Sequence, residues 1–105
     1  MAITTGLSRP LAQVQSGATP TIYNISVPLA ATEVSQALSI GVKKFVIKVR
    51  GMANLQLAFD PGQSGVDYIS IPSGTNFSED QIMFSGTLYF QTNKPNQVVE
   101  ILEWV

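Results

Sequence analysis

The chain contains no cysteine and no histidine among its 105 residues. The lack of cysteine excludes disulfides, thiolate zinc sites and cysteine nucleophiles. The lack of histidine removes the usual general base and the commonest metal ligand. Of the acids, Asp60 and Asp67 flank one turn and Glu79 and Asp80 are adjacent, which suits local structural roles. A calcium site at Asp60 and Asp67 lacks the alternating acids of a calcium loop. We therefore expect no enzymatic activity, no cofactor and no metal.

Charge is also scarce. Charged residues make up 12% of the chain and the net charge is −1, whereas an ordinary globular protein has about twice that charged share. No overall field attracts nucleic acid or acidic membranes. A surface filled with Ser, Thr, Asn, Gln and small apolar groups is typical of β proteins that pack against neighbours. A monomer kept soluble by amides and hydroxyls is the alternative that composition leaves open.

Long apolar runs are missing as well. None approaches the roughly 20 residues that span a bilayer, and the first residues lack the basic end and apolar run of a signal peptide. We expect a protein that is made and used in a cytoplasm, or assembled there into something larger, without a membrane partner. The length corresponds to one domain, which can bury roughly two-thirds of the surface of its unfolded chain.

Alternation of apolar and polar residues is the clearest positive signal. In residues 42–50, Phe45, Ile47 and Val49 alternate with the other side chains, and in residues 54–59 Leu55, Leu57 and Phe59 do the same. Strict alternation indicates a strand with one buried face. The short break at Gly51–Met52–Ala53 predicts that the two strands form a β-hairpin.

The rest of the chain predicts more short strands. They are expected at residues 21–27, 33–38, 67–72, 87–92 and 98–104, with turns at Asp60-Pro61-Gly62, Pro72-Ser73-Gly74 and Asn93-Lys94-Pro95-Asn96. Ser78-Glu79-Asp80-Gln81 predicts a capping box and one helical turn. Residues 98–104 are apolar on both faces apart from two acids, which places this strand inside a sheet or under a neighbour. About seven short antiparallel strands predict an all-β sandwich or barrel.

Residues 1–20 differ from the predicted domain at residues 21–105. They hold one charge, Arg9, and four apolar residues spaced by threes and fours: Ile3, Leu7, Leu11 and Val14. Pro10 in the middle disfavours a helix. We interpret the segment as an extended arm whose apolar residues contact a neighbouring subunit, and a disordered tail is the alternative.

The basic residues gather in one strand. Lys44, Lys48 and Arg50 share a strand face. The face is either solvated and protective of a sheet edge, in contact with an acidic neighbour, or a nucleic-acid stripe. No aromatic residue shares the strand face for stacking, so we expect no specific nucleic-acid binding. Aromatic residues elsewhere would serve a core, an interface or a sugar site; these are Tyr23, Tyr68, Phe77, Tyr89 and Trp104.

The order of segments from Tyr23 to Trp104 resembles small virion proteins of tailed bacteriophages. The matching elements are Lys43-Lys44-Phe45-Val46-Ile47-Lys48-Val49-Arg50, Leu55-Gln56-Leu57-Ala58-Phe59, the turn with Tyr68, Pro72 and Gly74, the pair Glu79-Asp80, Gly86-Thr87-Leu88-Tyr89-Phe90, and Val98-Val99-Glu100-Ile101-Leu102-Glu103-Trp104. The resemblance covers about four-fifths of the chain and includes no enzymatic signature.

The resemblance implies a β-sandwich structural protein of the virion, assembled in the host cytoplasm. We expect a capsid decoration (cement) protein that binds the major capsid protein or other virion proteins. The low charge and the two apolar faces of residues 98–104 favour a homo-oligomer, and the resemblance implies a trimer as its stoichiometry. A head-to-tail or tail component, or a carbohydrate- or receptor-binding module, is the alternative. Candidate assembly contacts are Ile3, Leu7, Leu11, Val14, Lys44, Lys48, Arg50 and Trp104.

Overall fold

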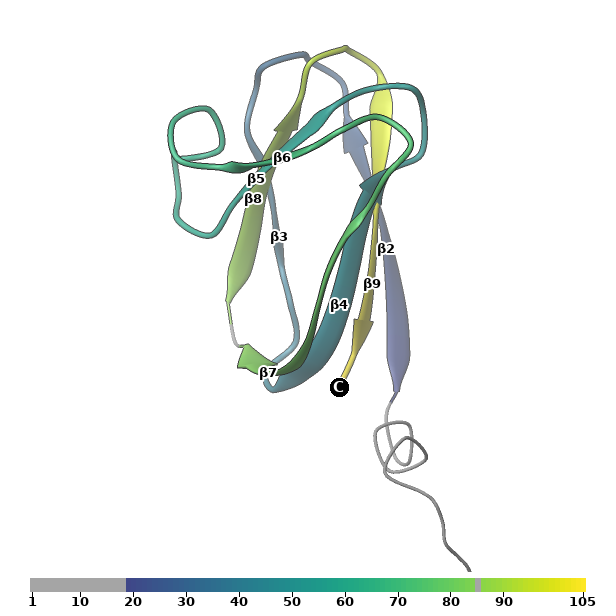
Figure 1. Ribbon diagram of the computed structural model, residues 1–105, viewed down its shortest axis with the longest axis vertical. Coiled ribbons are helices and arrows are strands. Elements are labelled where there is room, and N and C mark those ends of the chain that lie inside the picture. The colour runs from purple at the N-terminus through teal and green to yellow at the C-terminus, as the bar shows by residue number, and fades with distance from the viewer. Residues whose placement is uncertain (1–18, 85) are drawn as a thin grey trace, which may run out of the picture.

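The computed structural model describes residues 19–84 and 86–105, which form two four-stranded antiparallel sheets packed face to face (Figure 1). The first sheet has the order β2-β9-β4-β7, with β2 at Pro20–Val27, β9 at Gln97–Trp104, β4 at Val42–Val49 and β7 at Phe77–Phe84. The second has the order β3-β8-β5-β6, with β3 at Val34–Ala37, β8 at Thr87–Thr92, β5 at Leu55–Ala58 and β6 at Ile69–Ile71. The all-β prediction is confirmed, with eight strands rather than seven in the described residues and a sandwich rather than a closed barrel.

The core lies between the inner faces of the two sheets. Alternate residues of β8 and β9 and of the residue 45–49 part of β4 point inward, as a strand with one buried face requires. Nearly all solvent is excluded from the side chains of Phe45 and Ile47 in β4, Val99 and Ile101 in β9, Leu55 and Leu57 in β5, and Leu88 and Phe90 in β8. Tyr23 and Ile25 of β2 are partly buried against this core.

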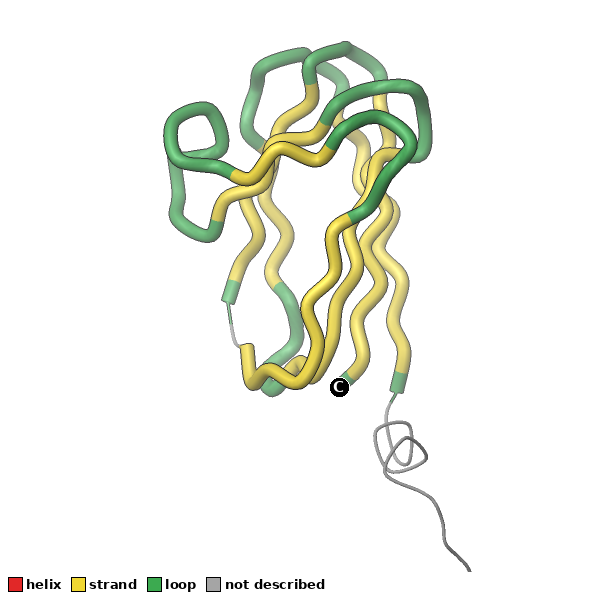
Figure 2. Tube along the Cα trace, in the orientation of Figure 1, coloured by secondary structure: helices red, strands yellow, loops and turns green. Residues whose placement is uncertain are grey.

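The predicted hairpin at residues 42–59 is wrong. β4 and β5 lie in different sheets, and the chain between them crosses from one layer to the other (Figure 2). Phe45, Ile47 and Val49 of β4 and Leu55 and Leu57 of β5 face one shared core, so the alternation would be the same in a hairpin and in a crossing. The predicted burial of Phe59 is wrong, because Phe59 follows the end of β5 and is 41% exposed. β4 instead pairs with β9 and β7 on its two sides. The alternation predicted the buried faces but not the hydrogen-bonding neighbours.

The predicted helical turn at Ser78–Gln81 is also wrong, because this segment belongs to β7. β7 pairs antiparallel with β4, and Phe77 packs against Phe45 with ring centroids 6.1 Å apart. A single helical turn has little stability of its own. A strand there gains the ladder with β4 and buries Phe77, so tertiary pairing overrides the local capping signal.

The C-terminal strand lies inside its sheet, as predicted. β9 sits between β2 and β4 and pairs with both. Glu103 points into the sandwich and is fully buried. Its carboxyl group accepts hydrogen bonds from the backbone N–H and the hydroxyl of Ser39, in the segment between β3 and β4. This polar contact holds the segment between β3 and β4 against β9, one of the two inner strands of the first sheet.

Two of the predicted turns depend on glycine. Gly62 and Gly74 adopt positive φ angles of 79° and 82°, a region that L side chains rarely occupy. They follow Pro61 and Ser73 in the turns that the sequence predicted, and Asn96 in the last turn has a φ of 58°. The local turn chemistry therefore predicted where these reversals occur, and tertiary hydrogen bonds such as those to Gly62 and Ser73 also hold them.

Candidate assembly surface

The outward face of the sheet β2-β9-β4-β7 combines apolar and charged side chains in rows across the strands. Strand register places Ile22, Leu102 and Val46 side by side in one row. The next row toward the chain termini contains Pro20, Trp104 and Lys44. Ile22 is 67% exposed, and Leu102, Val46 and Trp104 are partly exposed. We call this face, with these six residues and the charged cluster described next, the outer face.

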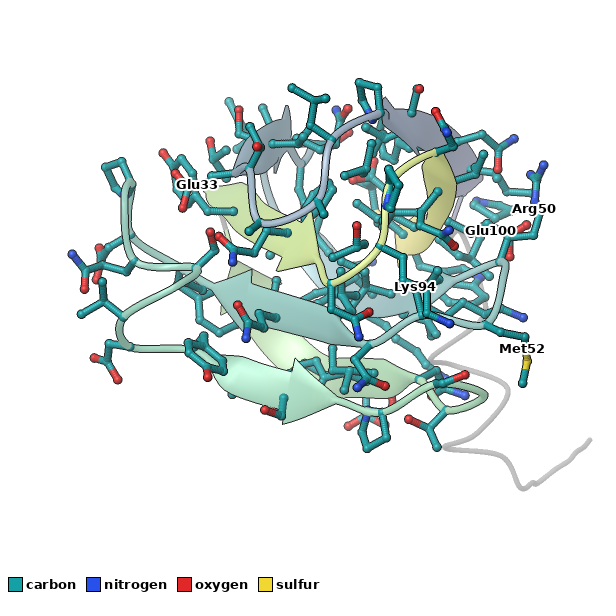
Figure 3. All side chains as sticks on the ribbon, turned by 90° about the horizontal axis from the view of Figure 1, so that it is seen from above. Glu33, Arg50, Met52, Lys94 and Glu100 are labelled. Atoms are coloured by element: carbon teal, nitrogen blue, oxygen red, sulfur yellow. The ribbon has the colours of Figure 1, made fainter. Side chains whose placement is uncertain are left out.

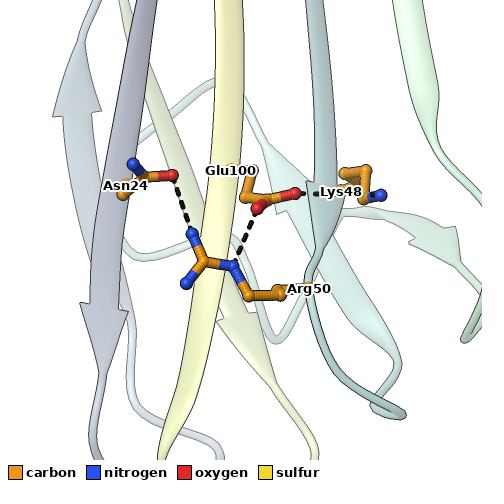
Figure 4. Close-up of polar contacts among 4 residues, drawn as sticks. All are labelled: Asn24, Lys48, Arg50 and Glu100. Carbon is orange, nitrogen blue, oxygen red and sulfur yellow. Dashed lines mark hydrogen bonds and ion pairs between the residues drawn. The ribbon is translucent and has the colours of Figure 1, made fainter.

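Glu100 is the centre of the charged cluster on the outer face (Figure 4). Arg50 Nε donates to Glu100 Oε2 at 2.8 Å, and Lys48 Nζ lies 3.7 Å from Glu100 Oε1. Arg50 also donates through Nη2 to Asn24 Oδ1 at 3.2 Å. The hydrogen bond from Arg50, with the charges of Arg50 and Lys48, lowers the pKa of Glu100. One carboxylate therefore offsets one of the two cations, and the cluster keeps one net positive charge.

Lys44 has a different partner. Its Nζ lies 5.1 Å from the centroid of the Trp104 ring, a cation–π distance. β4 and β9 place Lys44 and Trp104 directly opposite each other in the antiparallel register. The cation therefore sits over one face of the aromatic ring.

Four of the predicted contact residues are thus brought together on one face: Lys44, Lys48, Arg50 and Trp104. The interpretation in which the lysines protect a sheet edge is wrong, because β4 lies between β9 and β7. The other four predicted contacts, Ile3, Leu7, Leu11 and Val14, lie outside the described residues. Sequence reasoning missed Ile22, Asn24, Glu100 and Leu102, since only strand register places them beside the basic stripe.

The aromatic residues considered for a sugar site do not gather in one place. Tyr23 and Phe77 pack against the core, and Trp104 lies on the outer face. Tyr89 points away from the core on the second sheet, since its neighbours Leu88 and Phe90 point inward. Tyr68 precedes β6 in a loop. This distribution does not favour a carbohydrate platform.

A second polar cluster lies on the other side of the molecule. Figure 3 shows Glu33 far from Arg50 and Glu100. The Glu33 carboxylate accepts hydrogen bonds from Gly62 N at 2.8 Å, Ser64 N at 3.1 Å and Ser64 Oγ at 2.6 Å. The Ser64 hydroxyl bond, followed by the backbone bond from Gly62, lowers the pKa of Glu33. The cluster fixes the loop between β5 and β6 against the start of β3.

The calcium site considered at Asp60 and Asp67 falls within the part of the chain that the structure describes. No group of three or more Asp or Glu side chains there is placed to hold a metal ion, and Asp60 and Asp67 form no such group. Within residues 19–84 and 86–105, no helix has the length and hydropathy of a membrane span.

Comparison with known proteins leaves the family open. No protein-family model and no curated protein matches the chain. A solved structure from Bacillus endospore appendages, described as a family of disulfide-linked pili, is similar at 17% sequence identity and a TM-score of 0.41. The similarity covers 84% of this chain and 88% of that one. At this identity and TM-score it assigns neither a family nor a function.

Proposed function

We propose that this chain is a non-enzymatic structural protein of a virus particle, and that it binds and stabilises a tailed-phage capsid as a decoration (cement) protein. The observation that supports the proposal best is the outer face. It carries an exposed apolar row beside charged side chains on a rigid sheet, and this combination is common where proteins contact one another.

The apolar row supplies the affinity in this proposal. Fully burying an exposed side chain such as Ile22 contributes roughly 1.5–3 kcal/mol. Leu102 and Val46 are already partly buried and contribute less each. The charged groups add little affinity at a rim, but they orient the contact. With its net positive charge, the cluster around Glu100 suits an acidic neighbour.

Many copies on one lattice would convert a modest contact into a stable shell. A protein that binds the assembled lattice and not its dissociated subunits shifts the equilibrium toward the particle. Contacts repeated over neighbouring sites add avidity. The arm at residues 1–20, an expectation from the sequence, would add anchors on a neighbouring subunit through strand addition.

The test starts from virus particles purified from a culture that produces this chain. Electron cryomicroscopy locates the chain, and quantitative mass spectrometry counts its copies per particle. We expect many copies at equivalent positions on the head. Absence from the particle, or a few copies confined to the tail or the head–tail junction, would overturn the decoration role.

The outer face is then tested on particles that lack the chain, to which purified protein is added. Leu102→Gln removes an apolar group from the face and should weaken binding about ten-fold, which corresponds to about 1.4 kcal/mol. Val66→Gln is the matched control, because Val66 is 74% exposed and lies in the loop between β5 and β6 of the opposite sheet. Equal binding by both variants would exclude the outer face as the contact.

A further inference from the structure

The four edge strands of the sandwich differ in how well they are protected from pairing with another chain. In the described residues the edges are β2 and β7 of one sheet and β3 and β6 of the other. β3 and β6 contain only 4 and 3 residues, and β7 carries the exposed acids Glu79 and Asp80. Short length and charge are two usual protections of an edge. β2 has neither, since its 8 residues, PTIYNISV, include no charged side chain.

The backbone groups that face outward from β2 follow from its pairing with β9. Thr19 and Val105 exchange both backbone hydrogen bonds, at 3.2 Å each. In an antiparallel pair such hydrogen-bonded residues alternate with residues whose N–H and C=O point to the other side. The N–H and C=O groups of Ile22, Asn24 and Ser26 therefore point away from β9, along the outer edge of the sheet. Figure 1 shows β2 at this edge.

The prolines around this edge are placed symmetrically, and proline limits which residues can pair with another strand. Pro20 and Pro28 lie at equal distances on either side of Asn24. Proline has no N–H to donate, so each proline ends a run of outward-facing donors. Antiparallel pairing of two β2 strands with Asn24 opposite Asn24 sets Ile22 opposite Ser26. The same register leaves Pro20 opposite Pro28, just outside the ladder at both ends.

We infer that β2 pairs with β2 of a second copy of this chain, antiparallel and about a two-fold axis at Asn24, so that two four-stranded sheets join into one. In this register every outward N–H and C=O of Ile22, Asn24 and Ser26 finds a partner. On the inner side, Tyr23 lies opposite Ile25 of the second copy. An aromatic residue opposite a β-branched one is a favourable cross-strand pair, and both side chains are only partly buried within one copy.

A second copy fits this edge better than other occupants for two reasons. β2 has no charged side chain of its own, and Arg50, which donates to Asn24 near the axis, is paired with Glu100. Two β7 edges would instead bring Glu79 and Asp80 of each copy close to those of the other. The chain outside the described residues joins at Thr19, beyond Pro20 and so beyond the run that would pair. The contact is two-fold and replaces the trimer implied by the family resemblance. It uses the edge of β2 and leaves the outer face available for the proposed capsid contact.

The dimer should be concentration dependent in solution. A contact through one strand edge is smaller than the roughly 1,600 Å² of a standard stable interface. On a lattice, the same contact would link neighbouring copies and gain from their high local concentration. Because the inference concerns the free protein, its test does not require the particle.

The chain has no cysteine, so single cysteines report the register without background. In the inferred register Tyr23 and Ile25 of the second copy form a non-hydrogen-bonded pair with Cα atoms about 4.5 Å apart, within the disulfide range of about 4.4–6.8 Å. The two Tyr23 positions are offset from each other by two residues, or about 7 Å along the strands, and so are the two Ile25 positions. We expect an equal mixture of Tyr23→Cys and Ile25→Cys to form the mixed disulfide dimer under mild oxidation. Neither variant alone should form a disulfide dimer.

Non-reducing electrophoresis and intact mass spectrometry of the full chain give the readout. Failure of the mixture of Tyr23→Cys and Ile25→Cys to form the mixed dimer, or efficient self-cross-linking of either variant, would overturn the inferred register. In sedimentation equilibrium, Asn24→Pro should lower the dimer population at least ten-fold, because it removes the central outward N–H. Asn24→Ala keeps this N–H and should dimerise like the wild type. A trimer, or a monomer at millimolar concentration, would overturn the inference even if Asn24→Pro fails to fold.

Discussion

We predict that the hydrogen bonds between Glu103 and Ser39 stabilise the folded protein, and that mutation of either residue lowers its stability. Glu103 is 0% exposed, and its carboxyl group is bonded to both the backbone N–H and the hydroxyl of Ser39. Ser39→Ala removes the hydroxyl donor and leaves a buried acceptor with one partner fewer. Such a loss costs about 1–3 kcal/mol.

The loss of stability can be measured as a decrease in the melting temperature. For a domain of this size, 1 kcal/mol shifts the melting temperature by about 4–8 °C. Ser39→Ala should therefore lower the melting temperature by about 5–20 °C. Glu103→Leu should also destabilise the protein, because it leaves the Ser39 N–H without its acceptor. The double variant should lose less than the sum, since removing both partners leaves fewer unsatisfied groups.

A double-mutant cycle measured by urea denaturation separates this contact from general packing effects. We expect a coupling energy of at least about 1 kcal/mol between the two positions. Glu100→Gln is the matched control, because Glu100 lies on the same strand and faces outward. Glu100→Gln should lower the free energy of unfolding by less than Glu103→Gln does. A coupling below about 0.5 kcal/mol, the usual limit of additivity, would refute the role assigned to the contact.

Three further outcomes are expected. Folding lowers the pKa of Glu33 below its ordinary value of 4.5, so its contribution to stability is present above pH 4.5 and is lost as pH falls through the lowered pKa. Wild type should then lose its advantage over Glu33→Gln in acid, and a difference in unfolding free energy that does not change with pH would contradict this. The predicted arm at residues 1–20 is too long by two residues, because Thr19 pairs with Val105 and Pro20 begins β2. Deleting residues 1–18 should therefore leave the domain folded, as followed by a melting curve, but should weaken assembly in a particle-binding assay. Unchanged assembly would make the arm a dispensable tail, and loss of folding would place it in the sandwich. DNA binding should be weak and should vanish at physiological salt, because few phosphates can be neutralised and Lys48 and Arg50 share Glu100; sub-micromolar binding at that salt, measured by fluorescence anisotropy, would restore the nucleic-acid interpretation.

Local signals predicted the strands well and their connections poorly. The alternation of Phe45, Ile47 and Val49 marked the buried face of β4, which the structure confirms. The same alternation suggested a hairpin with β5, although β5 belongs to the opposite sheet. The alternation of apolar and polar residues shows only which face of a strand is buried. It carries no information about the neighbour, because both sheets bury their inner faces in one core.

For the outer face, too, the sequence predicted which side chains share a strand face but not which residues lie beside them on neighbouring strands. The sequence places Lys44, Lys48 and Arg50 on one strand face, since period-two spacing fixes their common side. It could not show that Trp104 lies under Lys44 or that Glu100 binds Arg50, because these residues are about fifty positions or more apart along the chain. Pairing across β4 and β9 alone brings them together.

The sequence by itself determined the all-β class, the buried face of most strands and the glycine-dependent turns, because backbone sterics and apolar burial act over a few neighbouring residues. Only the tertiary structure decided which strands share a sheet, that residues 78–81 extend β7, and which edge remains unprotected. Those choices depend on pairing between distant segments, whose hydrogen bonds and packing outweigh local preferences. The outer face and the β2 edge are products of that pairing.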